Sequence, residues 1–287
     1  MAHEELLDAD HLDHRQLDLA AAREATYVFS NEVTYEYPSP IRSLRHQFVV
    51  VPRMRHGDQR RIVQRLHADV PGRAAVRQRY DRFGNPVYEL HAPVVPERFS
   101  FGVRAVLHRS RDAEHERPWR NIHTAATRLT AVDDELRIAA ATLSGRSRGL
   151  DTAMAIGEGV RAAMTYEFGP TGVRTTAAEA WTLRRGVCQD MAHVMIAMCR
   201  ARGVRSRYVS GHLLGEGGSH AWVEVHDDAT GRTLAYDPTH ARAADLRYVT
   251  VAVGRDYRDV APTAGSYRSG PSGSLTVRKR VAITSVR

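Results

Sequence analysis

Three short segments of the chain, in a fixed order, contain the side chains of an activated cysteine nucleophile. They are Arg184–Asp190, Ser219–Trp222 and Tyr236–Thr239. The first offers a thiol (Cys188), the second an imidazole (His220) and the third a carboxylate (Asp237), each at the edge of a predicted helix or strand. A thiolate, a base that generates it and an acid that orients the base together perform nucleophilic acyl transfer. The ordered set, rather than any single residue, predicts this chemistry.

Cys188 lies two residues after Gly186, at the start of a helix predicted over 188–202. Free backbone N–H groups and the positive end of the helix dipole stabilise a thiolate there, and the same amides can hold an oxyanion. The ordinary alternative is a small buried cysteine, which fits Cys199 in the middle of the helix. The two cysteines are about 16 Å apart along one helix, whereas a disulfide needs Cα atoms within about 7 Å. We therefore expect two free thiols and a reducing compartment.

A hairpin explains how the imidazole and the carboxylate can meet. Strands are predicted over 220–226 and 233–237, joined by the turn 227–231. Matching the apolar side chains on one face gives the opposed pairs Ala221–Tyr236 and Val223–Leu234, and on the other face Trp222–Ala235 and His220–Asp237. Directly opposed Cβ atoms lie about 5 Å apart. We therefore expect an imidazole–carboxylate hydrogen bond across this hairpin, provided that the register does not slip.

Further residues are candidates to line the site. Gln189 follows the thiol, and Tyr166 is a candidate for the second oxyanion donor. Trp222 could shield the site from water, although a half-buried aromatic residue in a strand is more often part of the core. Asp190 and His193 are expected to be helix-surface and packing groups rather than further catalysts.

A metal site is the rival interpretation for the same part of the chain. Potential ligands gather here in the sequence: His212, His220, His226, Asp237 and His240, with Cys188 upstream. None of them falls in a recognised zinc spacing. We therefore expect no metal and no other cofactor.

The surrounding pattern predicts an α+β chain with two globular parts. Residues 1–25 form a polar leader, and β-branched or aromatic runs separated by Pro and Gly predict an antiparallel β-sandwich over 26–108. The runs are 27–29, 33–37, 48–51, 62–66 and 87–90. A polar linker is expected over 109–130, an α+β core over 131–261, and a loop with a returning strand over 262–287.

Within the core, helices are expected first and strands afterwards. Helical patterning covers 133–143 and 152–164, and a capping box at Thr176-x-x-Glu179 opens a helix that runs to Arg185 and is ended by Gly186. Strands are expected at 206–214, 220–226 and 233–237, and 274–286 alternates as a final strand. The expected architecture is therefore helices packed on an antiparallel sheet.

Composition limits the classes of partner. The net charge is +8, but Lys279 is the only lysine, and the arginines are scattered among 33 acidic residues. Short basic patches without interleaved aromatic residues are not typical of a nucleic-acid surface. No apolar run is long enough to span a bilayer, and the acidic N-terminus is unlike a secretory signal. We expect a cytoplasmic protein that binds neither nucleic acid nor membrane; its oligomeric state is left open.

The motifs resemble those of the bacterial branch of the transglutaminase-like, papain-related superfamily. The resemblance is carried by Thr176–Ala180, Arg184–His193, Arg207–Gly211, Ser219–Val225, Asp237–Thr239 and Val251–Val260, and in the N-terminal part by Tyr35–Pro38, Pro52–Arg53 and Asp81–Asn85. It implies a papain/transglutaminase-like core behind the family's N-terminal β-domain. It also implies that Cys188, His220 and Asp237 are nucleophile, base and orienting acid. His240 departs from the family, which usually has asparagine after Asp-Pro-Thr.

The resemblance leaves the reaction open, because the superfamily includes crosslinkers, peptidases, amidases and inactive scaffolds. We expect cysteine-dependent acyl transfer on an amide or peptide bond of a peptide or protein substrate, through a thioester. Hydrolysis is favoured over crosslinking, because crosslinking needs an amine-accepting subsite that nothing in the sequence reveals. The alternative from another class is a catalytically silent binding or scaffold module with the same fold.

Overall fold

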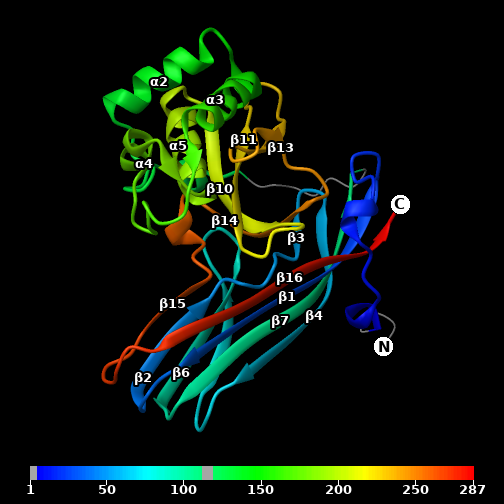
Figure 1. Ribbon diagram of the computed structural model, residues 1–287, viewed down its shortest axis with the longest axis vertical. Helices are drawn as coiled ribbons and strands as arrows, with labels where there is room; N and C mark the ends of the chain where they lie inside the picture. The colour runs from blue at the N-terminus through cyan, green and yellow to red at the C-terminus, as the bar shows by residue number, and fades with distance from the viewer. Residues whose placement is uncertain (1–4, 112–118) are drawn as a thin grey trace.

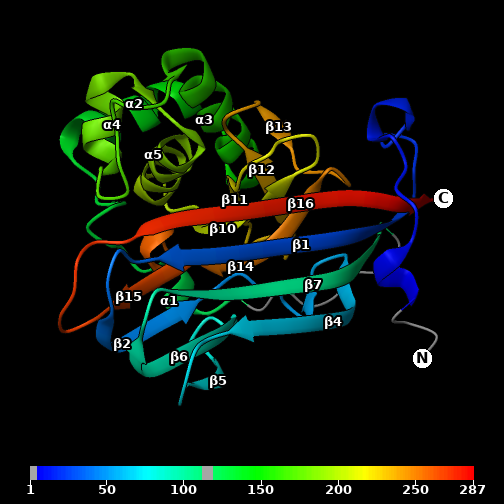
Figure 2. The ribbon, with the colours of Figure 1, turned by 60° about the horizontal axis from the view of Figure 1, so that its bottom comes forward.

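Two antiparallel sheets form the N-terminal half of the molecule. The computed structural model describes residues 5–111 and 119–287. The strands of this half are β1 (Glu24–Glu36), β2 (Ile41–Phe48), β3 (Arg55–His56), β4 (Gln59–Asp69), β5 (Ala75–Tyr80), β6 (Pro86–Val95) and β7 (Arg98–Ser110), joined by β15 (Thr263–Ser266) and β16 (Ser274–Val286) from the end of the chain. One sheet has the order β16-β1-β7-β4-β3 and the other β15-β2-β6-β5. Figure 2 shows the long strands of the first sheet lying side by side.

Aromatic side chains fill the space between these two sheets. Phe48 of β2 stacks on Phe101 of β7, with ring centroids 4.5 Å apart, and Tyr35 of β1 stacks on Phe99 at 5.0 Å. Phe99 and Phe101 are two residues apart in β7, so both point to the same face. Phe48, Phe99 and Phe101 are buried. Such alternation explains why the predicted β-sandwich forms, and the fold class is confirmed as α+β.

The second half packs helices against another antiparallel sheet. Its helices are α1 (Asn121–Thr124), α2 (Asp134–Ser144), α3 (Gly149–Ala163), α4 (Ala177–Leu183) and α5 (Cys188–Ala201). Its sheet has the order β13-β12-β11-β10-β14, built from β10 (Arg205–Leu213), β11 (His220–His226), β12 (Thr233–Asp237), β13 (Arg242–Ala243) and β14 (Tyr248–Gly254). A two-stranded parallel ribbon joins β8 (Thr165–Tyr166) to β9 (Arg185–Gly186). Short 3-10 helices lie at Glu5–Asp8 (η1), His14–Gln16 (η2) and Tyr257–Asp259 (η3).

Helix α5 is the centre of this half. Every residue from Gln189 to Cys199 is buried, because α2, α3 and α4 pack on one side of the helix and β10 and β11 on the other (Figure 1). A helix that is apolar over most of its circumference belongs in such a position. The N-terminus of α5 is thereby fixed relative to the sheet that carries His220 and Asp237.

The end of the chain returns to the N-terminal half. Strand β16 pairs antiparallel with β1 from Ala25↔Val286 to Glu36↔Ser274, and β15 pairs with β2. The returning strand expected over 274–286 is therefore present with those bounds. None of the helices in the described ranges is long and apolar enough to cross a bilayer.

Two carboxamides from the N-terminal half cover the free edge of β14. Gln59 donates to the carbonyl of Thr250 and accepts from its N–H, both at 2.8 Å. Asn85 does the same for Val253, at 2.8 and 3.0 Å. An edge strand exposes unpaired backbone groups, and here side-chain amides replace the missing strand. These four hydrogen bonds tie the two halves together.

Some local expectations were wrong. The run 48–51 is not a strand: β2 ends at Phe48, and the three valines that follow are buried in the core. Strand β5 was not predicted, because all six of its residues are exposed and show no alternation. Helix α4 ends at Leu183 rather than Arg185, since Arg184 adopts a left-handed conformation and lies over the Trp181 ring. Of the expected linker, residues 112–118 lie outside the described ranges.

Candidate active site

The start of α5 is fixed by a carboxylate directly behind Cys188. Asp190 accepts the backbone N–H of Val187 at 2.8 Å and the hydroxyl of Thr171 at 2.7 Å through the same oxygen. The side chain of Asp190 is 1% exposed, and burial raises its pKa. A Cβ on Gly186 would lie 2.6 Å from this oxygen, so only glycine fits there. Cys188 is a partly buried free thiol at the positive end of the helix.

The hairpin of β11 and β12 has a register two residues away from the one predicted. Val223 pairs with Tyr236 and His226 with Thr233. The hydrogen bond that closes the turn runs from the N–H of Asp227 to the carbonyl of Arg232, one residue further along the chain on each side than the predicted pairing of residues 226 and 231. A two-residue shift keeps every side chain on its predicted face. His220 therefore reaches Asp237 diagonally, and Nε2 of His220 lies 2.8 Å from Oδ2 of Asp237.

Asp237 is fully buried and accepts four hydrogen bonds. Its donors are His220 and the backbone N–H of Thr239, both at 2.8 Å, and His240 Nδ1 and the Tyr248 hydroxyl, both at 2.7 Å. Burial alone would raise the pKa of this carboxyl group. The hydrogen bonds from the two histidines and Tyr248 outweigh burial and hold its pKa well below the usual range. Asp237 is therefore ionised at neutral pH.

His220 lies between this carboxylate and the thiol. Its side chain is 2% exposed, and burial is the largest influence, lowering the pKa. Hydrogen bonds with Asp237, Cys188 and Glu216 outweigh that influence and raise the pKa of His220 to about 11. Nε2 faces Asp237, and Nδ1 lies 3.3 Å from Oε2 of Glu216. The imidazole is therefore set up to carry a positive charge beside Cys188.

Part of this chain matches the model of a known protein family. Residues 137–238 match the model of the transglutaminase-like superfamily. This chain contains a transglutaminase-like domain. An uncharacterized protein of Mycobacterium leprae is 40% identical over 127 residues, which are 41% of this chain and 44% of that protein. One of Mycobacterium tuberculosis is 40% identical over 125 residues, or 39% and 40% of the two chains. This chain thus covers less than half of the curated relatives it matches.

A solved structure resembles nearly the whole chain. It is a protein of Cytophaga hutchinsonii, described as a candidate cysteine protease, that superimposes with a TM-score of 0.75 at 23% identity over 92% of both chains. At this identity, the likeness shows a shared fold, which includes the N-terminal half as well as the transglutaminase-like domain.

The three residues that were predicted to line the site, Tyr166, Gln189 and Trp222, lie in different structural environments. Tyr166 pairs with Gly186 in the small ribbon and is 41% exposed. Partial burial, with a smaller electrostatic contribution from Cys188, raises the pKa of Tyr166 to about 12. Gln189 donates to the carbonyl of Gly172 at 3.4 Å. Trp222 is 2% exposed and lies beneath His220, with ring centroids 6.3 Å apart.

Two groups at the site were not predicted as participants. Glu216 bridges His220 Nδ1 and His240 Nε2, the latter at 3.6 Å, and Tyr248 donates to Asp237. Glu216 and His220 are four residues apart across a Gly-Gly-Ser segment, which is the one local signal for the contact. Tyr248 comes from β14, two strands away from β11, so no sequence spacing points to it. His240 was noted from the sequence as a candidate metal ligand and as a departure from the family pattern, but not as a partner of Asp237 or Glu216.

Three of these groups also have the donor types of a metal site. The ligand atoms of His220, Asp237 and His240 lie within 4.8 Å of one another. However, the same nitrogens are hydrogen bonded to Oδ2 of Asp237 at 2.8 and 2.7 Å. The ring nitrogens that face Asp237 are thus satisfied within the cluster, and the other nitrogen of each histidine faces Glu216. His212 and His226 have other partners, Gly218 and Thr233.

Proposed function

We propose that this protein is a cysteine acyl-transfer enzyme that cleaves an amide or peptide bond through a thioester, with Cys188, His220 and Asp237 as nucleophile, base and orienting acid. The observation that supports it is the position of His220, which shares hydrogen bonds with both Asp237 and Cys188. A charged imidazole next to a thiol at a helix N-terminus favours the thiolate.

The mechanism follows from this arrangement. The sulfur of Cys188 attacks the carbonyl carbon, and the carbonyl oxygen takes the negative charge, which N–H groups at the start of α5 can stabilise. His220 gives its proton to the leaving amine as the C–N bond breaks, leaving a thioester. His220 then takes a proton from water, which attacks the thioester and releases a carboxylic acid and the thiol. Asp237 keeps the imidazole oriented throughout.

Hydrolysis is the proposed outcome in preference to crosslinking. Water needs no binding site of its own, whereas an amine acceptor needs a second subsite. The two can be told apart by incubating the enzyme and an amide substrate with a labelled primary amine. Free acid as the main product supports hydrolysis, and label incorporated in its place supports transfer.

One observation favours a silent binding module as the second candidate. Glu216 contacts Nδ1 of His220, the nitrogen that a reactive thiol would use. If that contact is permanent, the thiol is never activated, and the fold serves only to bind.

The test is the rate at which iodoacetamide alkylates Cys188, measured against pH by mass spectrometry. At pH 6 an ordinary cysteine, with a pKa of about 8.5, is almost all thiol. We expect rapid labelling of Cys188 at this pH, lost in His220→Ala. Cys199 is the internal control, because it is fully buried and burial raises its pKa to about 12. Equally slow labelling of both cysteines would rule out the enzyme and support the silent module.

A further inference from the structure

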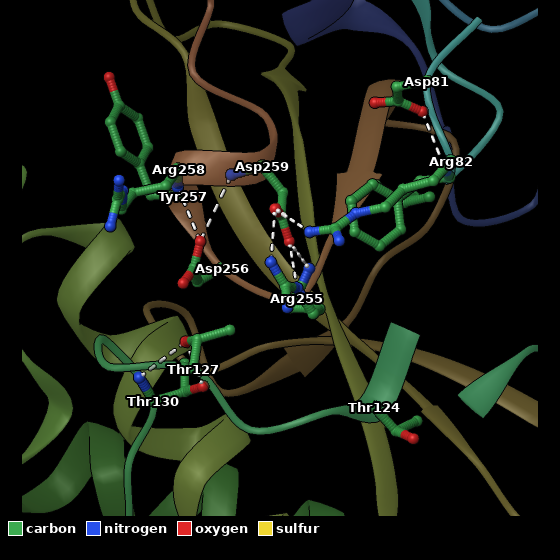
Figure 3. A network of polar contacts seen from close by, with 12 residues as sticks. Asp81, Arg82, Thr124, Thr127, Thr130, Arg255, Asp256, Tyr257, Arg258 and Asp259 are labelled. Carbon is green, nitrogen blue, oxygen red and sulfur yellow. Dashed lines mark hydrogen bonds and ion pairs between the residues drawn. The ribbon is translucent and has the colours of Figure 1, made fainter. Parts of the chain in front are cut away.

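A polar groove whose lining does not include Cys188 lies beside α5. It has a volume of about 1060 Å³, and its lining includes Arg128, Leu129, Val173, Arg174, Tyr257 and Arg258. We call it the arginine groove. Residues 127–129, which precede α2, form one side, the loop 173–174 a second, and η3 with the start of β15 a third. Figure 3 shows the η3 side, with Tyr257 and Arg258 above Thr127 and Thr130.

The two acidic residues that line the groove already have hydrogen-bond partners. Asp259 accepts from Arg255 at 2.8 Å and from Arg82 at 3.3 Å (Figure 3). Asp256 is buried and accepts the N–H groups of Arg258 and Asp259 at the start of η3. Neither carboxylate forms an ion pair with Arg128, Arg174 or Arg258.

Three exposed guanidinium groups remain. Within residues 5–111 and 119–287, the side chains of Arg128, Arg174 and Arg258 make no hydrogen bond or ion pair. Arg128 is near enough to Glu179 to add to the hydrogen bonds from Thr176 that lower the pKa of that carboxyl group. The three arginines come from three separate segments, and all three line one cavity. Guanidinium groups bind carboxylates with two parallel hydrogen bonds. Their convergence gives the groove an excess of positive charge and suits it to a ligand with several carboxylates.

Both walls of the groove are anchored on the helix that carries the thiol. The loop that ends at Arg174 is held by Asp190, through Thr171 at 2.7 Å. The η3 wall is held by His193, whose Nε2 accepts the N–H of Tyr257 at 3.1 Å. His193 is five residues after Cys188, about 7.5 Å along the helix axis.

We propose that the arginine groove binds carboxylate side chains of the amide substrate, so that the enzyme acts on acidic peptides. This proposal rests on the proposed function, because the peptide bound in the arginine groove is taken to be the same peptide whose amide bond reaches Cys188. A nucleic acid would also be attracted by the charge. However, the groove has one half-buried aromatic side chain, Tyr257, rather than the series of stacking platforms that bases require.

The test measures binding separately from catalysis. In Cys188→Ala, fluorescence anisotropy follows a labelled glutamate-rich peptide and a glutamine-rich peptide of the same length. We expect the glutamate peptide to bind more tightly, with an affinity that falls as ionic strength rises. Substituting Gln for Arg128, Arg174 and Arg258 together should weaken its binding by roughly ten-fold. The control substitutes Gln for three exposed arginines outside the groove, Arg45, Arg77 and Arg161, and should change affinity by less than about two-fold.

Three results would overturn the groove as an acidic-peptide site. They are equal affinity for the two peptides, an equal loss in the control variant, and tighter binding of a single-stranded DNA of similar length. Failure of the proposed function is seen elsewhere, in the iodoacetamide labelling of Cys188, since this neutral reagent does not need the groove. An unreactive Cys188 with arginine-dependent peptide binding would leave the groove standing as a binding site alone.

Discussion

Glu216 places a second carboxylate at the point where the thiolate has to form. Its Oε2 lies 3.3 Å from Nδ1 of His220, and its side chain is 38% exposed. The residue lies in a glycine-rich loop, between Gly215 and Gly217. Its negative charge favours the imidazolium but disfavours a neighbouring thiolate. The raised pKa of His220 leaves the imidazole charged without this help, because Asp237 remains.

Glu216→Gln should therefore increase the reactivity of Cys188. Removing the charge takes away repulsion from the thiolate and frees Nδ1 for the thiol. We expect iodoacetamide labelling at pH 6 to become roughly three-fold faster, since a partly exposed charge acts through a high dielectric. The control is Glu167→Gln, because Glu167 pairs with Arg185 on the surface. Slower labelling in Glu216→Gln would show instead that this carboxylate holds the imidazole in place for the thiol.

His220 and Asp237 make the free energy of unfolding depend on pH in opposite directions. The raised pKa of His220 gives stability that is fully present below pH 6.5, its unfolded value, and is lost as the pH rises toward about 11. The lowered pKa of Asp237 gives stability that is present above about pH 3.8 and is lost as the pH falls. The contribution of the pair is therefore largest in mildly acidic solution.

His220→Gln tests this in urea. Glutamine can still donate to Asp237 but cannot be charged. We expect the difference in unfolding free energy between the native protein and this variant to be largest near pH 6 and to shrink steadily toward pH 10. A difference that is constant over this range would mean that the imidazole is neutral in the folded protein, and the thiolate–imidazolium pair would then be untenable.

At the scale of elements, the helix that carries the thiol begins where it does because of Gly186. An added Cβ would meet Oδ2 of Asp190 at 2.6 Å and displace the carboxylate from Val187 and Thr171. Loss of a helix cap costs about 1 kcal/mol. Gly186→Ala should lower stability by about this amount and slow labelling of Cys188 at pH 6 by roughly ten-fold. Gly172→Ala is the control, since a Cβ there meets nothing within 4 Å; an equal effect of both changes would show that the cap is not what positions the thiol.

The sequence predicts elements with strong periodicity better than it predicts their contacts. Strands 220–226, 233–237 and 274–286 have the expected bounds, because alternation and turn residues mark both ends. The β11–β12 register was wrong by two residues, since residue types fix which face a side chain takes but not where the turn closes. His220 and Asp237 still meet, because diagonal neighbours on one face are within reach. Strand β5 is exposed throughout, so burial left no pattern in its residues. Tyr248 reaches the site because β14 lies two strands from β11 in the sheet, and this strand order cannot be seen in the sequence.

At the scale of the whole molecule, the two halves share a continuous core and a seam of buried polar groups. Glu224 on β11 accepts from Arg207 at 2.8 Å and from His56 of the N-terminal half at 2.7 Å. Burial lowers the pKa of His56 to about 4, so it is neutral at pH 7. Gln59 and Asn85 pair with the edge of β14 nearby. Because β16 also returns to β1, the chain crosses between the halves at both ends of the transglutaminase-like domain. The site is therefore supported from the N-terminal sheets as well as from its own.

We therefore expect that two substitutions are enough to make the two halves unfold separately. Gln59→Ala with Asn85→Ala leaves four backbone groups of β14 without their partners, at a cost of about 1 kcal/mol or more for each group that stays dry. We expect the native protein to unfold in urea in one transition. The free energy of unfolding of the double variant should be lower by several kcal/mol, and its transglutaminase-like half should unfold first. Tryptophan fluorescence reports on that half, since Trp119, Trp181 and Trp222 all lie there, and β-sheet circular dichroism reports on the whole. The contrary result is that fluorescence and circular dichroism of the double variant change together, at the urea midpoint of the native protein. It would mean that the apolar core alone holds the halves together, and that the amide pairs on β14 serve only to cover its edge.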